Sequence, residues 1–123
     1  MLEEKKLVIM VDDNPVSLQS GINVFLENYS VATIPSAVKL FEFLKTKIPD
    51  IILLDIDMPD VDGYQIMRAL KLRPDTKNIP VIFLTAMTDE VNEKKGLSMG
   101  AVDYIKKPFQ PSDLVKRVEA HLF

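Results

Sequence analysis

The sequence predicts an α/β domain in which a parallel β-sheet is covered by helices on both faces. Five short apolar runs recur along the 123 residues, and segments with helical spacing of apolar residues lie between them. Runs that are apolar throughout are typical of parallel strands, because helices cover both faces of such a sheet. The alternation of strand and helix favours β–α units in one sheet. We therefore expect one domain spanning residues 1–123, a length that suits a single core.

Polar residues stand at the ends of four of the expected strands. The strands are expected at residues 7–11, 31–34, 51–54, 81–84 and 104–107. Asp12 and Asp13 follow the first strand, Asp55 follows the third, Thr85 follows the fourth, and Lys107 closes the fifth. Because ligands bind at the carboxyl ends of the strands in open parallel sheets, the sequence predicts a polar site at that edge.

Capping residues and apolar spacing indicate the first three helices. Asn14 and Pro15 open the first, Ser36 opens the second, and a turn signal at Asp62 and Gly63 precedes the third. Their apolar faces comprise Leu18, Ile22, Phe25 and Leu26, then Leu40, Phe41 and Leu44, then Ile66, Met67 and Leu70.

The last two helices differ in their apolar faces. The fourth, at residues 89–99, has a thin apolar face among several charged residues and ends at Gly100. The fifth opens with Pro111, and its apolar face comprises Leu114, Val118 and Leu122. A helix like the fourth is usually just a solvated face, but it also suits an element that shifts or docks with a partner.

Composition excludes several classes of protein. The formal net charge of −3 and the pI near 5.1 argue against direct binding of nucleic acid by this chain. The absence of Cys excludes disulfides and thiolate metal sites. The charged first six residues do not resemble a signal peptide, and no apolar run approaches the ~20 residues of a membrane helix. We expect a cytoplasmic protein without a membrane partner.

Three carboxylates, those of Asp12, Asp13 and Asp55, are expected to meet at the sheet edge. Any one of them alone would be read as a helix cap or a turn residue. Together they repel one another, so the fold needs a neutralising partner, and Mg²⁺ with its oxygen ligands fits. Strand alternation puts Lys107 on the face opposite Lys106. Two interpretations of Lys107 remain: it offsets the negative charge of the three carboxylates, or it is an ordinary solvated lysine at the end of a strand.

The same residues match the needs of phosphoryl transfer, which are a nucleophile, a metal ion and fixed donor groups. Asp55 would be the nucleophile and would form an acyl phosphate. Thr85 would supply a hydroxyl donor, and the small Ala86 would leave the pocket open. Taken alone, Thr85 is equally well explained as a strand-end turn residue.

Four segments in this order and spacing resemble the response regulator receiver family of two-component signalling, and the resemblance covers essentially the whole chain. They are residues 11–14 (VDDN), 53–59 (LLDIDMP) followed by Asp62 and Gly63, 84–86 (LTA), and 100–109 (GAVDYIKKPF). The resemblance implies the chemotaxis-regulator-like, flavodoxin-like (βα)5 fold with strand order 2-1-3-4-5. It also implies that Asp55 is the phosphoacceptor.

The resemblance further assigns roles to individual residues. It implies that Asp13 and Asp55 ligate Mg²⁺ directly, that Asp57 contributes its backbone carbonyl, and that Asp12 acts through water. Thr85 would move toward the phosphoryl group while the aromatic side chain of Tyr104 turns inward. Tyr104 is otherwise a core or rim aromatic of the fifth strand.

Two further expectations concern the loops around the site. The resemblance places the side chains of Asp57 and Met87 beside the path of the water that hydrolyses the acyl phosphate. Together with the sharp turn required after Lys107, it points to a cis peptide bond before Pro108.

The partners are also implied by the resemblance. A sensor histidine kinase or a phosphotransfer protein would supply the phosphoryl group. An output domain or effector protein would bind the face formed by the fourth helix, fifth strand and fifth helix. A homodimer that depends on phosphorylation would be a further possible assembly. The resemblance thus implies a signalling phosphoacceptor and not an enzyme beyond its own phosphorylation and dephosphorylation.

Two other functions remain as alternatives. The motif Asp55-Ile56-Asp57 after an apolar strand is similar to the signature of haloacid-dehalogenase-type phosphatases. Against this, Pro59 stands where those enzymes have Thr or Val, and their acidic strand normally comes first in the chain. The second alternative is a degenerate receiver that only binds partners, and the presence of every acceptor-site residue argues against it.

Overall fold

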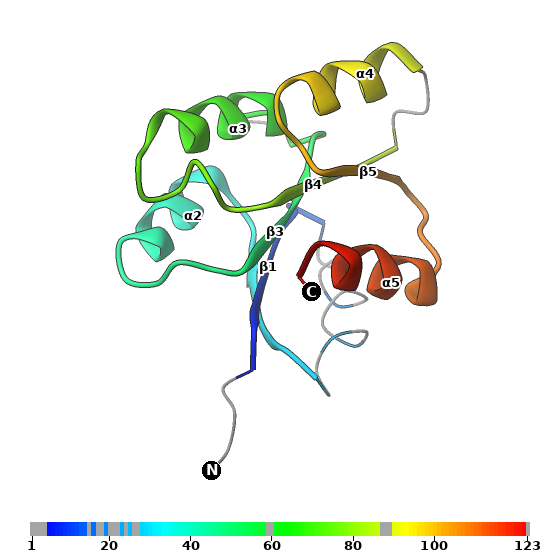
Figure 1. Ribbon diagram of the computed structural model, residues 1–123, viewed down its shortest axis with the longest axis horizontal. Coiled ribbons are helices and arrows are strands. Elements are labelled where there is room, and N and C mark those ends of the chain that lie inside the picture. The colour runs from blue at the N-terminus through cyan, green and yellow to red at the C-terminus, as the bar shows by residue number, and fades with distance from the viewer. Residues whose placement is uncertain are drawn as a thin grey trace.

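The computed structural model describes residues 5–14, 16, 19, 23, 25, 28–58, 61–86 and 90–122. Its strands are β1 (Leu7–Val11), β2 (Ser30–Ile34), β3 (Ile51–Asp55), β4 (Val81–Thr85) and β5 (Asp103–Lys106). They form a sheet of order β2-β1-β3-β4-β5 in which each neighbouring pair is parallel (Figure 1). The predicted α/β class and strand order are confirmed.

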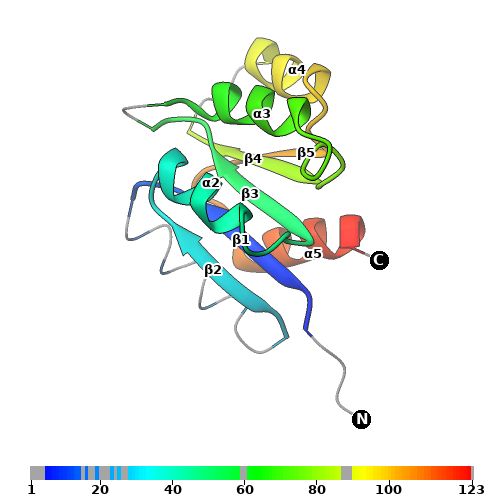
Figure 2. The same ribbon diagram turned by 90° about the vertical axis from the view of Figure 1, so that its left-hand side faces the viewer.

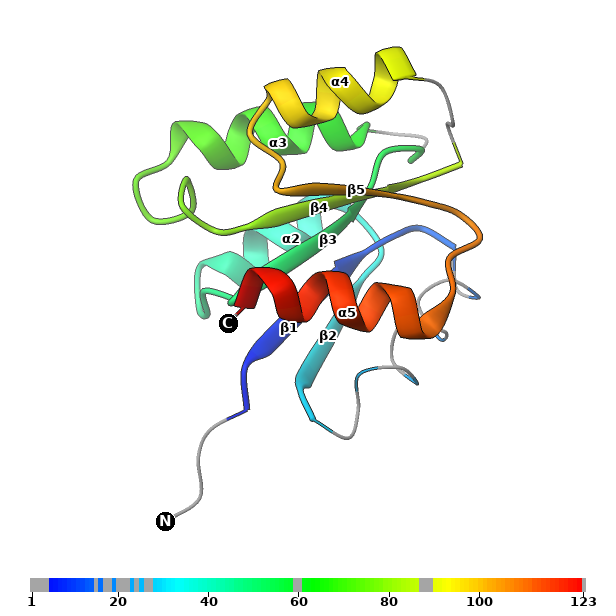
Figure 3. The same ribbon diagram turned by 45° about the vertical axis from the view of Figure 1, so that its right-hand side comes forward.

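Helices cover both faces of the sheet, as predicted. The helices of the described residues are α2 (Ala37–Leu44), α3 (Gly63–Leu72), α4 (Glu90–Ser98) and α5 (Pro111–Leu122). Figure 2 shows α2, α3 and α4 on one face and α5 on the other, and Figure 3 brings α5 to the front. None of these helices has the length and apolar character needed to cross a bilayer.

The apolar strands divide their side chains between two cores. In β3, Ile52 and Leu54 belong to the core beneath α2 and α3, whereas Ile51 and Leu53 belong to the core beneath α5. This alternation is the two-residue period of a strand, and it explains why the runs are apolar throughout. Asp55 ends β3 at the edge of these two cores and is only 2% exposed.

Local capping explains where two of the helices begin. The Ser36 hydroxyl accepts a hydrogen bond from the Lys39 backbone N–H at 3.3 Å, so the predicted cap of α2 is confirmed. Asp62 and Gln65 form a reciprocal capping box at the start of α3, with each side chain accepting from the other residue's backbone N–H. The carboxylate of Asp62 also interacts favourably with the positive end of the helix dipole.

The predicted first helix lies mostly outside the described residues. The undescribed part of this helix includes Pro15, Leu18, Ile22 and Leu26. Elsewhere in the chain, Met87 also lies outside the described residues. Two contacts of the described residues agree with the prediction. The Asn14 side chain accepts from the Val16 backbone N–H at 2.9 Å, and Phe25 is buried in the same core as Leu114 and Val118 of α5.

Close backbone approach makes Gly63 necessary where α3 meets the end of β3. The Gly63 N–H donates to the Ile56 carbonyl at 3.1 Å. A Cβ atom at this position would lie 2.7 Å from the Asp55 carbonyl oxygen and 2.8 Å from the Ile56 Cα atom. These are backbone atoms, so a side chain could be accommodated only if α3 moved away from β3. The glycine therefore fixes the position of α3 against the backbone of Asp55.

We expect Gly63→Ala to lower the free energy of unfolding by about 1–3 kcal/mol, the usual cost of overpacking. The gain in helix propensity, up to ~1 kcal/mol, opposes this effect but is smaller. Urea unfolding followed by circular dichroism measures the change, with Arg68→Ala at an exposed position of the same helix as the control. A Gly63→Ala protein as stable as wild type would show that α3 adjusts without cost.

Candidate functional site

The parallel register brings the predicted site residues to one edge of the sheet. Asp55 pairs with Leu84, and Thr85 pairs with Lys106, so the chain segments after β3, β4 and β5 leave the sheet at the same level. Ligand oxygens of Asp12, Asp13 and Asp55 lie within 4.8 Å of one another. The predicted convergence of three carboxylates is therefore present in the structure.

Lys107 lies within this acidic cluster. Its ammonium group is 2.5 Å from the Asp12 carboxylate and 3.5 Å from the Asp55 carboxylate. Lys106 is exposed, so the predicted alternation between the two lysines is correct. Lys107 lies one residue beyond the end of β5, where its N–H donates to the Thr85 carbonyl at 2.8 Å. The Lys107–Pro108 peptide bond is cis, as expected.

The three acidic residues differ in their surroundings. Asp12 is fully buried, and its two oxygens accept hydrogen bonds from Lys107 and from the Asn14 backbone N–H at 2.9 Å. Asp13 is exposed at the mouth of the site. Asp55 accepts a hydrogen bond from the Asp57 backbone N–H at 3.1 Å. Because the oxygens of Asp12 already have partners within the protein, Asp13 and Asp55 are better suited to direct ligation of a cation.

The pKa of the Asp55 carboxyl reflects its burial and the imbalance of charge around it. Burial, followed by the negative charge of Asp12, raises the pKa of Asp55 from 3.8 to about 6. The hydrogen bond from the Asp57 N–H and the positive charge of Lys107 act in the opposite direction but only partly compensate. One lysine therefore does not neutralise the cluster.

This donor set fits Mg²⁺. The side chains offer only carboxylate oxygens, which are hard ligands, and Asp13 leaves the site open to solvent so that a cation could retain water molecules. The raised pKa of Asp55 shows that ionisation of this carboxyl is opposed without a further positive charge. Both observations favour a divalent cation among these residues.

Thr85 and Asp57 meet in a contact that the sequence did not reveal. Thr85 is fully buried at the end of β4, and its hydroxyl donates to the Asp57 carboxylate at 3.1 Å. Asp57 is exposed. The two residues were predicted separately, as a hydroxyl donor and as a backbone-carbonyl ligand, and no pattern in the sequence links their side chains.

Tyr104 lies in the apolar core beneath α4 and not among the polar side chains of the site. It is 5% exposed, in the same core as Tyr64 and Phe83. Gly96 of α4 allows this packing, since a Cβ atom there would be 2.8 Å from the Phe83 ring and 3.3 Å from the Tyr104 ring. A glycine inside a helical pattern was the available signal for this close approach.

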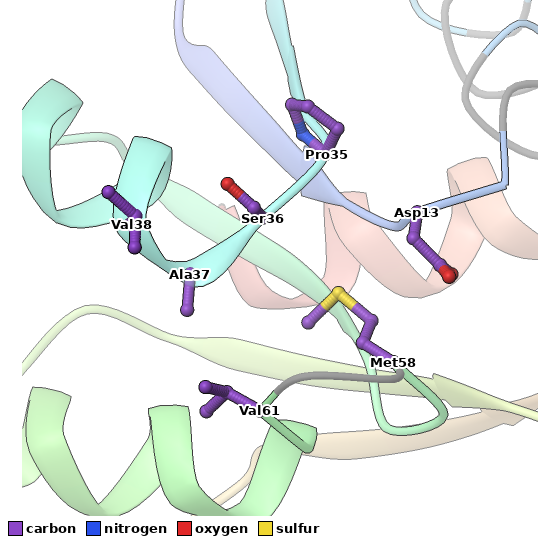
Figure 4. A pocket seen from close by; sticks show the side chains of 7 residues that line it. All are labelled: Asp13, Pro35, Ser36, Ala37, Val38, Met58 and Val61. Atoms are coloured by element: carbon purple, nitrogen blue, oxygen red, sulfur yellow. The ribbon is translucent and has the colours of Figure 1, made fainter.

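A small apolar hollow adjoins Asp13. It has a volume of about 120 Å³ and lies between the start of α2 and the segment that leads to α3 (Figure 4). Its lining residues are Asp13, Pro35, Ser36, Ala37, Val38, Met58 and Val61. The mouth of the acidic site thus has an apolar surface on one side.

Comparison with known proteins agrees with this geometry. The family model described as "Response regulator receiver domain" matches residues 8–119. The phosphate regulon transcriptional regulatory protein PhoB of Rhizobium meliloti (strain 1021) is 35% identical over 117 residues, covering 95% of this chain and 52% of that protein. A probable cyclic di-GMP phosphodiesterase of Vibrio cholerae serotype O1 is 36% identical over 115 residues, covering 94% and 26%.

Solved structures give the same result for the fold. The chemotaxis protein CheY4 of Vibrio cholerae has a TM-score of 0.90 and 25% identity, with 96% of this chain and 99% of that chain covered. By contrast, the chain spans about half of the PhoB relative and about a quarter of the phosphodiesterase relative. The whole matched fold is thus present here, whereas these curated relatives contain additional sequence.

We expect the stability of the metal-free protein to depend on pH through Asp55. Its folded pKa of about 6 lies above the unfolded value of 3.8, so the folded state retains a proton that the unfolded state has released. Stability is therefore lost as pH rises from about 4 to 6, by up to ~3 kcal/mol.

Asp55→Asn removes this titration. Its advantage over wild type in urea unfolding with EDTA should be small at pH 4, grow until about pH 6 and then level off. Asp75→Asn at an exposed position is the control and should show no such growth. A constant difference between Asp55→Asn and wild type across this range would contradict a raised pKa.

Proposed function

Because this chain belongs to the response regulator receiver domain family, the phosphoacceptor switches of two-component signalling, we propose that its acceptor is Asp55. One observation carries the assignment: Asp55 ends the central strand β3 among two other carboxylates and a lysine, and it is the member that contacts both Lys107 and the β3–α3 loop. The phosphoryl donor is a phosphohistidine on a sensor kinase or on a phosphotransfer protein.

The reaction is an exchange of one phosphorus bond for another. A carboxylate oxygen of Asp55 attacks phosphorus, the phosphorus–nitrogen bond of the phosphohistidine breaks, and the imidazole leaves with that electron pair. Asp55 becomes an acyl phosphate. Lys107, already 3.5 Å from the Asp55 carboxylate, offsets the charge of the incoming phosphoryl oxygens.

Mg²⁺ would be held by the carboxylates of Asp13 and Asp55 and by the backbone carbonyl of Asp57, with Asp12 acting through water. The cation supplies positive charge for the phosphoryl oxygens and relieves the repulsion among the acidic side chains. The burial of Asp12 and its hydrogen bonds to Lys107 and Asn14 support its indirect role.

The output side of the domain is proposed to be the face formed by α4, β5 and α5. Thr85 would donate to a phosphoryl oxygen, and Tyr104 beneath α4 would report this change to the surface. The recipient would be an output domain or an effector protein, or a second copy of the phosphorylated chain. The two matched relatives with different named activities support an output that lies outside residues 1–123.

The surroundings of the acceptor also suit a protein donor. Asp13 is exposed at the mouth of the site, and the apolar hollow lies directly beside that residue. We therefore propose that the donor presents an apolar side chain next to its phosphohistidine. The charged remainder of the surface and the net charge of −3 support a cytoplasmic protein partner and not nucleic acid.

We expect acetyl phosphate and Mg²⁺ to add one phosphoryl group to the protein, labile to base and to hydroxylamine. Asp55→Asn should abolish the added mass of phosphate, whereas Asp57→Asn should retain it. Intact-protein mass spectrometry measures both. Phosphate labelling of Asp57 would refute the acceptor assignment, and catalytic release of phosphate from small phosphomonoesters would indicate the phosphatase alternative.

We expect Mg²⁺ to stabilise the fold, because it offsets the repulsion among Asp12, Asp13 and Asp55. At a hundred-fold excess over its dissociation constant, the cation adds about 2.7 kcal/mol to the free energy of unfolding. Thermal melts with millimolar Mg²⁺ measure this, and Asp13→Ala should remove most of the shift. Asp75→Ala, remote and exposed, should leave the shift intact. Melts that do not respond to Mg²⁺ would rule out the cation site.

A further inference from the structure

Asp57 connects the proposed acceptor Asp55 with the hydroxyl of Thr85. Its backbone N–H donates to an Asp55 oxygen at 3.1 Å, and its carboxylate accepts from the Thr85 hydroxyl, also at 3.1 Å. One residue thus contacts the proposed phosphoacceptor through its backbone and the proposed switch residue through its side chain.

Hydrogen bonds to two neighbouring segments anchor the backbone carbonyls of Leu84 and Thr85. The Thr85 carbonyl accepts from the Lys107 N–H at 2.8 Å, and the preceding carbonyl, of Leu84, accepts from the Ile56 N–H at 3.1 Å. Thr85 is β-branched and fully buried, which restricts it to a few discrete rotamers. The hydroxyl can therefore change acceptors by rotation about its C–O bond or by a step between these rotamers.

A threonine hydroxyl has one proton and can donate one full hydrogen bond at a time. In the structure that bond goes to Asp57. If Thr85 is to donate to a phosphoryl oxygen on Asp55, as the proposed function requires, it must first release the Asp57 carboxylate. The two acceptors therefore compete for one proton.

We propose that the Asp57 carboxylate is a latch that holds the Thr85 hydroxyl in the unphosphorylated state and so sets the threshold of the switch. This inference rests on the proposed function. Asp57 acts here as a positioning residue, since it determines where another residue's hydroxyl points. A ligand shifts a conformational equilibrium only by the difference between its interaction free energies with the two states. Breaking the Asp57–Thr85 hydrogen bond costs free energy, so it reduces the free energy with which the phosphoryl group drives the switch.

The expected strength of the latch follows from its surroundings. Hydrogen bonds contribute more when one partner is charged, but Asp57 is exposed and water competes for its oxygens. The coupling between the two side chains should therefore change equilibrium constants by about three- to ten-fold. A shift of this size moves a switch without preventing its operation.

A double-mutant cycle in the resting protein tests the contact directly. The variants are Asp57→Ala, Thr85→Val and the double variant, compared by urea unfolding in EDTA. The latch predicts a coupling of about three- to ten-fold in the unfolding equilibrium constant. Thr85→Ser keeps the hydroxyl and should keep the coupling. Additive effects of the two substitutions would overturn the latch, whether or not the protein accepts phosphate.

A second cycle uses beryllofluoride, a stable mimic of the phosphoryl group on a carboxylate, with Mg²⁺ present. Asp57→Ala removes both the latch and a negative charge, so it should tighten beryllofluoride binding in calorimetric titrations. In the Thr85→Val background only the charge effect remains, so the improvement should be about three- to ten-fold smaller. Asp57→Asn keeps an oxygen acceptor and should show the charge effect alone.

Equal improvement in both Thr85 backgrounds, or weaker binding by Asp57→Ala, would show that Asp57 does not compete for the hydroxyl. The experiments distinguish failure of the proposed function from failure of the latch. If the proposed function is wrong, the wild-type protein will not bind beryllofluoride, while the coupling between Asp57 and Thr85 in EDTA stays measurable. If the latch is wrong, the wild-type protein will bind beryllofluoride and the coupling in EDTA will be absent.

Discussion

The structure depends on the placement of three carboxylates at the carboxyl edge of a parallel sheet. Strand polarity brings Asp12, Asp13 and Asp55 together, and each added negative charge makes the next more costly. The fold compensates with Lys107, which follows the edge strand β5 and contacts Asp12 and Asp55. The compensation is incomplete, as the raised pKa of Asp55 shows. A site left short of positive charge is suited to bind a cation and then a phosphoryl group.

In the proposed function, this edge communicates with the surface formed by α4, β5 and α5. Two aromatic rings, of Tyr64 and Phe83, meet edge to face with centroids 5.4 Å apart beneath it. The Lys95 ammonium group lies 4.1 Å from the centre of the Tyr64 ring, and Gly96 lets the helix approach Phe83. A helix held by rings and by one cation–π contact, with little aliphatic interdigitation in its described residues, can shift at modest cost.

Asp57 shows how an exposed residue acquires a role from its neighbours. Exposure alone would suggest a solvated loop side chain with little effect on the fold. Its two hydrogen bonds instead place it between Asp55 and Thr85: its backbone N–H donates to the Asp55 carboxylate, and its side chain accepts from the Thr85 hydroxyl. If the proposed latch operates, variation at this position adjusts the response of the domain while the proposed acceptor chemistry stays intact. Such a separation of threshold from chemistry suits a fold that serves many outputs.

Features of the fold that depend on residues near one another in the sequence were predictable, whereas contacts between distant segments were not. The strands, the cap at Ser36, the acids at the strand ends and the inward face of Lys107 were all predictable, because apolar period and capping act between residues near in sequence. The end of β5 was misplaced by one residue, since Lys107 follows the strand instead of belonging to it. Strand order came from resemblance to a family, and the cis bond before Pro108 came from that resemblance together with the sharp turn required after Lys107.

By itself, the sequence determined which side chains gather at the sheet edge, because parallel strands carry their last residues to one level. Only the tertiary structure decided how those side chains share their charges and protons. Lys107 pairs with Asp12 across 95 residues, and Thr85 reaches Asp57 across 28. Burial of Asp12 beside exposed Asp13 is likewise a property of the assembled fold. Such contacts and pKa values depend on distances through space between separate segments, and no local pattern encodes those distances.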